Sequence, residues 1–267
     1  MNTYPELRGK VAIVTGAGRR NGLGAAMARR LHAEGCKVVL SDIAANEALP
    51  AIVAELCASG GDALGIDCDV LQESQVQSLV AGAVSAYGRL DIMVNNAGIG
   101  YLMQPLVEME QANWDAVLGV NLRGVFFGIK HAARQMLAQG GGGRIINIGS
   151  QAAKSGFPFA ASYVASKHGL VGLTRTAAIE LGQHRITVNA LCPNHVTTGL
   201  GAWQNEFFSK ATGRSEAQYM SDMRARIPLG RPGLQDDTAK ACAFLASNQA
   251  DYITGEAMNV SGGEEYH

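Results

Sequence analysis

The chain has 267 residues, with 22 Lys and Arg against 23 Asp and Glu, so its formal net charge is −1. This balance gives no electrostatic reason to expect nucleic acid or an anionic membrane as a partner. The N-terminal sequence lacks a charged-then-apolar signal pattern, and no apolar run approaches the roughly 18 residues that span a bilayer. We therefore expect a cytoplasmic protein that does not enter a membrane.

Short β-branched runs alternate with longer segments of helical period along the chain. We predict strands at 10–15, 37–42, 62–70, 91–98, 143–150, 186–193 and 256–263. We predict helices at 22–34, 46–58, 72–87, 111–139, 161–182 and 235–247. Apolar strands without polar alternation are typical of a parallel sheet with helices on both faces. The pattern predicts an α/β fold with a doubly wound, mainly parallel sheet of about seven strands, in a single domain over 1–267.

One long segment, 198–230, has no strand character but is rich in aromatic residues and Met. Loops of that length are usually functional or disordered. The apolar content of this one favours a lid inserted over a substrate pocket.

The five cysteines, Cys36, Cys57, Cys68, Cys192 and Cys242, are an odd number and show no CxxC spacing. This pattern argues against a disulfide framework and against a zinc site. We expect reduced thiols in the core and no bound metal.

A glycine-rich turn, TGAGRRNGLG at 15–24, joins the first predicted strand to the first predicted helix. In such a turn the backbone N–H groups can approach a pyrophosphate, and the following helix N-terminus favours its negative charge. The candidate contacts are Gly16, Asn21, Gly22, Leu23 and Gly24. The alternative is a tight strand-to-helix turn that needs glycine only for its backbone conformation.

Asp42 ends the second predicted strand, 18 residues beyond Gly24. A carboxylate there can accept hydrogen bonds from both hydroxyls of an adenosine ribose and would repel a 2′-phosphate. It therefore favours NAD over NADP as the cofactor. Arg19 and Arg20 are the counterargument, because either could reach a 2′-phosphate, although exposed arginines on a turn are usually solvated.

Tyr163 and Lys167 lie four residues apart at the start of a predicted helix, so they share one face of it. A free phenol has a pKa of about 10, and a neighbouring cation favours its phenolate. Tyr163 could then exchange a proton with a substrate hydroxyl while a hydride moves to or from nicotinamide. Alone the pair is weak evidence, because such residues are usually a ring at the edge of the core and a solvated amine.

The pair does not stand alone. With the glycine-rich turn, NNAG at 95–98, Asn121 in VNLRG, Ser150 in INIGS and PNHVTT at 193–198, nearly the whole chain closely resembles the short-chain dehydrogenase/reductase family. The resemblance implies a Rossmann fold and an NAD(P)-dependent oxidoreductase, and it says almost nothing about the substrate.

The resemblance also implies roles for individual residues. The family's catalytic tetrad falls on Asn121, Ser150, Tyr163 and Lys167. Ser150 would orient the substrate oxygen, Tyr163 would be the acid and base, Lys167 would hold the nicotinamide ribose, and Asn121 would position a water beside Lys167. Further cofactor contacts fall on Asp69, Val70, Asn96, Ala97, Gly98, Val196 and Thr198. Asn121 as a structural amide and Asp69 as a strand-end cap are the alternatives.

Two departures from the family pattern matter. The glycine-rich turn is two residues longer, around Arg19 and Arg20. The family's Pro-Gly after the sixth strand is replaced by Pro193-Asn194, where Asn194 is expected to tolerate a left-handed backbone. His195 follows, and its place suggests that it donates a hydrogen bond to a polar substrate; a loop histidine facing water or the lid is the alternative.

The leading hypothesis is an NAD-dependent dehydrogenase of a small alcohol, polyol or sugar-like substrate, with Ser150, Tyr163 and His195 at the substrate. An NADPH-dependent ketoreductase of the same fold and a non-catalytic dinucleotide sensor are the alternatives. The resemblance also implies a homo-oligomer, a tetramer or dimer, and the small and apolar residues at 124–133 and 169–181 are compatible with helix pairing between subunits.

Overall fold

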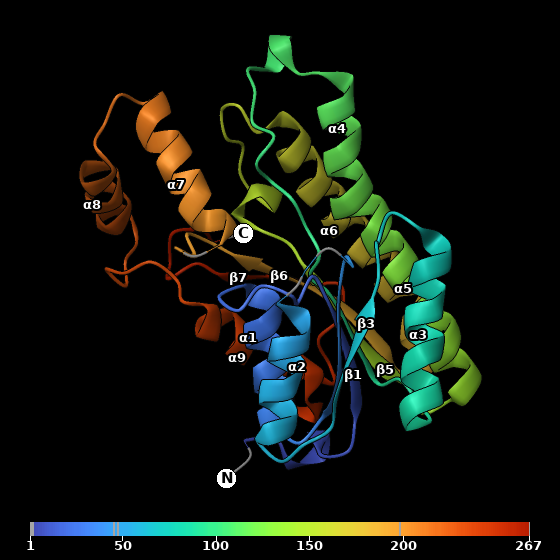
Figure 1. Ribbon diagram of the computed structural model, residues 1–267. Helices are drawn as coiled ribbons and strands as arrows, with labels where there is room; N and C mark the ends of the chain where they lie inside the picture. Colours follow the sequence, from blue (N-terminus) through green and yellow to red (C-terminus); the bar gives the residue numbers. More distant parts are fainter. Residues whose placement is uncertain (1–2, 45, 47, 198, 267) are drawn as a thin grey trace.

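The computed structural model describes residues 3–44, 46, 48–197 and 199–266. Within these residues a parallel sheet has the strand order β3-β2-β1-β4-β5-β6-β7 (Figure 1). The strands are β1 (Val11–Thr15), β2 (Lys37–Asp42), β3 (Ala63–Asp67), β4 (Ile92–Asn95), β5 (Gly143–Ile148), β6 (Ile186–Pro193) and β7 (Ala257–Val260). The predicted doubly wound, parallel sheet is confirmed.

Helices cover both faces of this sheet. They are α1 (Leu23–Ala33), α2 (Leu49–Ala58), α3 (Glu73–Tyr87), α4 (Gln111–Leu118), α5 (Gly124–Gln139), α6 (Ala161–Leu181), α7 (Leu200–Ala211), α8 (Glu216–Arg226) and α9 (Gln235–Ala246). In Figure 1, α1, α2 and α9 lie on one face and α3, α5 and α6 on the other, while α7 and α8 stand apart beyond β7. Single residues account for two of the helix ends. Gly88, with a φ of 80°, terminates α3. The Ser215 hydroxyl accepts a hydrogen bond from the N–H of Gln218 at the start of α8.

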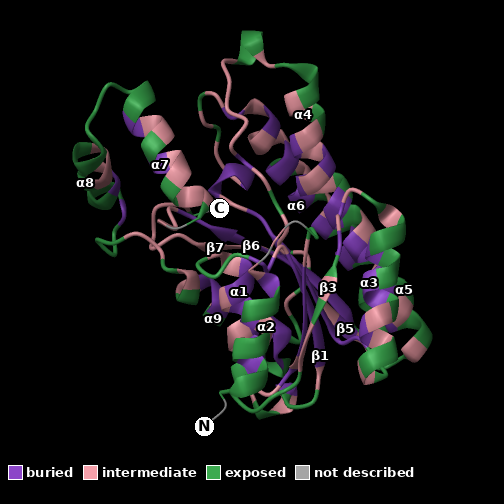
Figure 2. Ribbon diagram, viewed as in Figure 1, coloured by how far each residue is buried: buried purple, intermediate pink, exposed green. Residues whose placement is uncertain are grey.

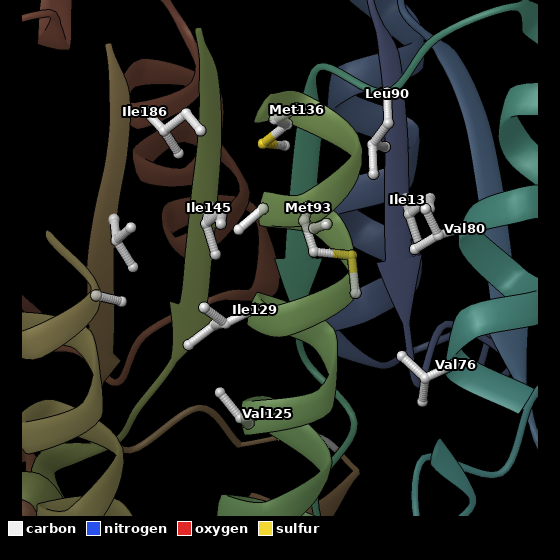
Figure 3. Packing of buried hydrophobic residues seen from close by; sticks show 14 of the residues in the cluster. Ile13, Val76, Val80, Leu90, Met93, Val125, Ile129, Met136, Ile145 and Ile186 are labelled. Carbon is white, nitrogen blue, oxygen red and sulfur yellow. The ribbon is translucent and has the colours of Figure 1, made fainter. Parts of the chain in front are cut away.

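The alternation of side chains along each strand explains why the strands are apolar throughout. In β1, Val11 and Ile13 pack into one buried cluster with residues of α3, α5 and α6 (Figure 3), whereas Ala12 and Val14 pack into a second with α1, α2 and α9. All four side chains are completely buried. Figure 2 shows the buried central strands between helices whose outer faces are exposed. Both faces of the sheet are therefore core, as expected for a doubly wound fold.

Strand order fixes where a ligand can bind. The chain runs from β1 outward to β2 and β3 and then returns to place β4 on the other side of β1. In open parallel sheets a crevice forms at such a reversal, at the carboxyl ends of the strands.

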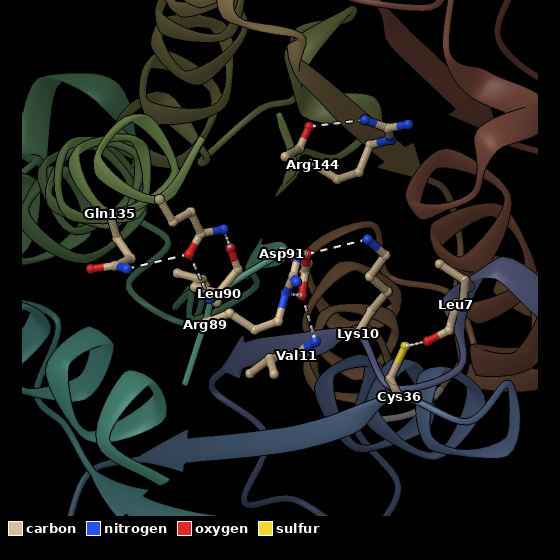
Figure 4. A network of polar contacts seen from close by, with 11 residues as sticks. Leu7, Lys10, Val11, Cys36, Arg89, Leu90, Asp91, Gln135 and Arg144 are labelled. Atoms are coloured by element: carbon tan, nitrogen blue, oxygen red, sulfur yellow. Dashed lines mark hydrogen bonds and ion pairs between the residues drawn. The ribbon is translucent and has the colours of Figure 1, made fainter. Parts of the chain in front are cut away.

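A polar network closes the opposite end of the sheet. The buried carboxylate of Asp91 accepts from the N–H of Val11 at 2.9 Å and from both ends of the Arg89 guanidinium, with Lys10 at 3.4 Å (Figure 4). Burial works to raise the pKa of Asp91, but these hydrogen bonds outweigh it and hold the pKa below its usual value. The network ties β1 to β4 on the side away from the crevice.

Three details differ from the predictions. The helix predicted at 111–139 is interrupted by a π-helical turn at Gly119–Arg123, and the segment 198–230 contains the helices α7 and α8. Cys57 is exposed rather than in the core, while the other four cysteines are buried.

No helix in the described part of the chain is long and apolar enough to cross a membrane.

Candidate active site

A cavity of about 870 Å³ lies where the strands end. Residues that follow β1 to β6 line it, together with α7, α8 and the segment after β7. Fourteen of the predicted site residues are in its wall: Gly16, Gly22, Leu23, Asp42, Asp69, Val70, Asn96, Ala97, Gly98, Ser150, Tyr163, Lys167, His195 and Val196. Asn21, Gly24 and Asn121 do not line it, and Thr198 lies outside the described residues.

The glycine-rich turn forms one end of the cavity, and its glycines are sterically required. Gly16 has a φ of 64°, and a Cβ on it would lie 2.7 Å from the Cα of Ala97. A Cβ on Gly24 would lie 2.5 Å from the carbonyl oxygen of Gly16. The Asn96 amide donates to the carbonyls of Thr15 and Gly16 at 2.8 and 2.9 Å, which fixes the turn against the loop after β4. The result is a backbone-lined cradle before the N-terminus of α1, which suits a pyrophosphate.

The extra residues of this turn bend back on themselves. The N–H of Gly22 donates to the carbonyl of Arg19 at 2.9 Å, and the Arg19 guanidinium donates to the Tyr101 hydroxyl at 3.0 Å. Arg20 lies 3.6 Å from Glu55 on α2, with both side chains exposed. Asn21, which does not line the cavity, accepts a hydrogen bond at its carbonyl from the Gln235 amide at 2.9 Å.

One acidic residue, Asp42, ends β2, and another, Asp69, lies two residues after the end of β3. One oxygen of Asp42 accepts from the N–H of Gly18 at 2.8 Å and the other from the N–H of Ile43 at 2.9 Å. Because an ionised carboxylate has about four acceptor positions, it keeps capacity for a ligand. Asp69 accepts from the N–H of Leu71 at 2.9 Å, so it does cap its turn while still facing the cavity.

Ser150, Tyr163 and Lys167 meet on the middle of the wall. Ser150 follows β5, while Tyr163 and Lys167 project from the first turns of α6. The Lys167 ammonium is buried, donates to the carbonyl of Ile148 at 2.7 Å and lies 5.7 Å from the centre of the Tyr163 ring.

Burial dominates the titration of this pair. It raises the pKa of Tyr163, against a hydrogen bond with Ser150 that lowers it, and it lowers the pKa of Lys167 to about 8. Burial and Ser150 account for the Tyr163 shift, and the expectation that Lys167 favours the Tyr163 phenolate stays a prediction.

Asn121 stands behind the wall, in the π-helical turn. Its side chain is completely buried, accepts from the N–H of Ile99 at 2.9 Å and donates to the carbonyl of Ile99 at 2.9 Å. Its amide also donates to the Ser166 hydroxyl at 3.2 Å. In this geometry the amide fixes the loop after β4 against α6.

A polar cluster at the far end of the cavity contains two residues that sequence reasoning missed, Glu264 and Arg226. The Glu264 carboxylate contacts Asn194 at 2.6 Å, His195 at 3.1 Å and Arg226 at 3.0 Å. The left-handed backbone expected at Asn194 falls instead on His195, with a φ of 42°. Glu264 is 70 residues from Asn194 in the chain, and no local pattern points to the contact.

Aromatic side chains pack against one another on α7 and α8. Tyr101 meets Trp203 edge to face with ring centres 5.8 Å apart, and Trp203 stacks on Phe207 at 5.4 Å. Phe208 and Tyr219, from α7 and α8, stack at 6.5 Å and both line the cavity. These two rings and the polar cluster around Glu264 line the same part of the cavity.

Comparison with known proteins agrees with this geometry. Residues 16–265 match the family model described as Enoyl-(Acyl carrier protein) reductase. A short-chain dehydrogenase/reductase of Armillaria gallica is 42% identical over 96% of this chain and 96% of its own length.

Two similar solved structures contain different dinucleotides. Actinorhodin polyketide ketoreductase with NADPH has a TM-score of 0.90 and 38% identity, over 97% of this chain and 98% of its own. NAD⁺-bound xylitol dehydrogenase has a TM-score of 0.90 and 32% identity, over 97% of this chain and all of its own. The chain belongs to the short-chain dehydrogenase/reductase family of oxidoreductases.

Proposed function

We propose that this protein transfers a hydride between NAD(H) and a CH–OH or C=O group of a small molecule. The observation that carries the proposal is the position of Ser150, Tyr163 and Lys167 in one cavity, between the glycine cradle and the aromatic wall of α7 and α8. A bound dinucleotide would place its pyrophosphate at the cradle around Gly16 and supply or accept the hydride.

The residues of the chain supply the proton and the orientation. Tyr163 exchanges a proton with the substrate oxygen, and Ser150, its hydrogen-bond partner, holds that oxygen. Lys167, anchored on the carbonyl of Ile148, holds the nicotinamide ribose. Because burial raises the pKa of Tyr163, the phenol is protonated at neutral pH, which is the form that donates a proton to a carbonyl oxygen.

The preference for NAD rests on Asp42. Its carboxylate lines the cavity at the end of β2, where a 2′-phosphate would meet negative charge. Arg19 and Arg20 are already engaged with Tyr101 and Glu55. We expect kcat/KM to be higher with NAD(H) than with NADP(H), and Asp42→Ala to reduce that ratio at least tenfold. Asp67→Ala is the matched control, because Asp67 pairs with Asp42 across the sheet but is exposed and outside the cavity wall.

The substrate end joins apolar and polar groups. Met103, Phe157 and Leu200 line it with Phe208 and Tyr219, and polar side chains line it too, among them Gln204, Asn205 and Glu264. The proposed substrates are therefore small alcohols, polyols or sugar-like molecules. We further propose that the segment 198–230, with α7 and α8, is the lid that covers the substrate.

An NADPH-dependent ketoreductase is the second candidate, favoured by the similarity to a polyketide ketoreductase solved with NADPH. Turnover of one ketone with NADH and with NADPH separates the two candidates. Tyr163→Phe tests the enzyme itself: it should bind dinucleotide normally and lose turnover. A wild type that binds dinucleotide but is inert across a broad panel of alcohols and ketones would instead be a sensor.

We also propose that the chain forms a homo-oligomer. Phe126 and Leu137 on α5 and Ile179 on α6 are large apolar side chains that are 43%, 42% and 83% exposed in the single chain. Sedimentation velocity should give at least twice the mass of 28.0 kDa.

A further inference from the structure

After β7 the chain bends back on itself at 261–265, a segment that we call the C-terminal turn. Two side chains hold this turn from within. The Ser261 hydroxyl donates to the carbonyl of Glu265 at 3.3 Å, and the Asn259 amide donates to the same carbonyl at 3.1 Å. The turn carries two adjacent carboxylates, Glu264 and Glu265, and each of them bonds a different part of the molecule.

Glu264 bonds the end of the segment that we propose as the lid. Its Oε1 accepts from Nε of Arg226, the last residue of α8, at 3.0 Å. Its Oε2 accepts from the buried amide of Asn194, which follows β6, at 2.6 Å. The backbone adds a third link, because the N–H of Leu229 donates to the carbonyl of Gly262 at 3.1 Å. The end of the lid is therefore joined to the C-terminal turn.

Glu265 bonds the loop that follows β5. A single oxygen, Oε1, accepts from the Gln151 amide at 2.7 Å and also from the Ser155 hydroxyl. Gln151 is buried, lines the cavity and directly follows Ser150 in the chain. One carboxylate oxygen therefore holds both ends of the turn at 151–155.

The hydroxyl of Ser150 depends on that turn for its own position. It accepts from the N–H of Ala152 at 3.2 Å, and the Ser150 carbonyl accepts from the N–H of Ala153 at 2.9 Å. The same hydroxyl is the hydrogen-bond partner of Tyr163. A shift of the turn at 151–155 would therefore move the donors that fix Ser150 beside Tyr163.

We propose that Glu265 is a positioning residue for hydride transfer, which orients Ser150 by holding the turn at 151–155, while Glu264 holds the lid from the same C-terminal turn. Glu265 does not line the cavity, so it acts through Ser150 rather than on the substrate. The inference rests on the proposed hydride transfer for its kinetic effect.

The kinetic test uses NAD⁺ and the substrate that the wild type oxidises fastest in a panel that includes cyclohexanol, 1-phenylethanol and xylitol. Glu265→Ala should lower kcat by about tenfold or more, because a catalytic group misplaced by about 1 Å can cost about a hundredfold. The KM and the Kd of NADH should stay within about threefold. Glu265→Gln keeps an acceptor oxygen and should retain kcat within about threefold.

Glu264→Ala should give the opposite pattern. Without this carboxylate the lid loses its bond to the C-terminal turn, so KM should rise by about fivefold or more while kcat stays within about threefold. Glu256→Ala is the matched control for both variants. Glu256 is an exposed glutamate directly before β7, and its loss should change neither constant.

Ser155→Ala provides a milder variant in case Glu265→Ala does not fold. It removes one of the two donors to Glu265 and should lower kcat by about threefold. Substitutions that remove one shared interaction are not additive, so the double variant should be no slower than Glu265→Ala. Ser59→Ala is the control, because its hydroxyl also donates one bond, to the carbonyl of Leu56 at 2.7 Å, but lies at the end of α2. It should leave kcat unchanged.

A second measurement does not depend on turnover. Hydrogen exchange at the N–H groups of Ala152 and Ala153 reports whether the turn that bonds Ser150 is held in place. In Glu265→Ala this exchange should accelerate by about tenfold or more relative to the N–H groups of β5. Glu265→Gln and Glu256→Ala should leave it unchanged.

The outcomes separate the inference from the function. An unchanged kcat in Glu265→Ala, or an equal loss in Glu265→Gln, overturns the role of Glu265 and leaves hydride transfer standing. Equal changes in kcat, KM and the Kd of NADH overturn it as well, because they indicate a general loss of structure. An unchanged KM in Glu264→Ala overturns the role of Glu264. If the wild type is inert across a broad panel of alcohols and ketones, the proposed reaction fails, and hydrogen exchange alone decides whether Glu265 holds the turn after Ser150.

Discussion

Replacing Asn121 with Leu tests whether its buried amide fixes the loop after β4. Leucine has nearly the same size but cannot bond the N–H and the carbonyl of Ile99, each now 2.9 Å from the amide. A buried polar group left unpaired costs about 1–3 kcal/mol, so two such groups give about 2–6 kcal/mol. Ile99 is only half-buried and water can reach it, so we expect the lower part, about 2–4 kcal/mol.

The free energy of unfolding in urea measures this loss, and a protein of this size should also melt roughly 5–12 °C lower. Asn113→Leu is the control. Asn113 is half-buried and its amide bonds a single side chain, Gln104 at 2.9 Å, so its loss should be below about 1 kcal/mol. Hydrogen exchange at the N–H of Ile99 should accelerate in Asn121→Leu beyond the global change. A loss under about 1 kcal/mol, or unchanged exchange at Ile99, would refute this reasoning.

Three further results are expected. Gly16→Ala, whose Cβ would lie 2.7 Å from the Cα of Ala97, should weaken dinucleotide binding more than tenfold by calorimetry; Gly60→Ala, also at positive φ but with open space around it, should not. Because the pKa of Lys167 is about 8 in the folded chain, its unfolded form binds one more proton above pH 8, and the contribution of Lys167 to stability grows from pH 8 to 10.5. The buried thiols, with their raised pKa, act in the opposite direction in both proteins, so the measure is the stability of the wild type minus that of Lys167→Met, which should grow by up to about 3 kcal/mol; equal slopes would contradict it. Cys57 alone of the five cysteines is exposed, so a thiol reagent should modify one thiol rapidly in the native protein and five after unfolding.

The sequence alone predicted the parallel sheet and most of the site residues that line the cavity. Strand β1 is apolar at every position because it is buried on both faces, and such strands are visible without any contact information. Two features of the site are similarly local: Tyr163 and Lys167 are four residues apart on one helix, and Gly16 has a positive φ of 64° in a turn encoded within ten residues.

The contacts that the sequence did not predict join residues that lie far apart in the chain. Glu264 meets Asn194 only because β6 and β7 are neighbours, and a glutamate after two glycines carries no local signal for that contact. The left-handed backbone was assigned to Asn194 from its general tolerance, yet the contact with Glu264 accompanies it at His195.

The contact between Arg19 and Tyr101 has a consequence for anyone who redesigns this protein. Arg19 adjoins Gly18, which bonds Asp42, while Tyr101 packs on Trp203 of α7. We therefore expect a library that varies Trp203 to disturb also the loop that we propose binds the dinucleotide. Coenzyme choice and substrate range should shift together in such libraries, and selection for one trait should use an assay that records both.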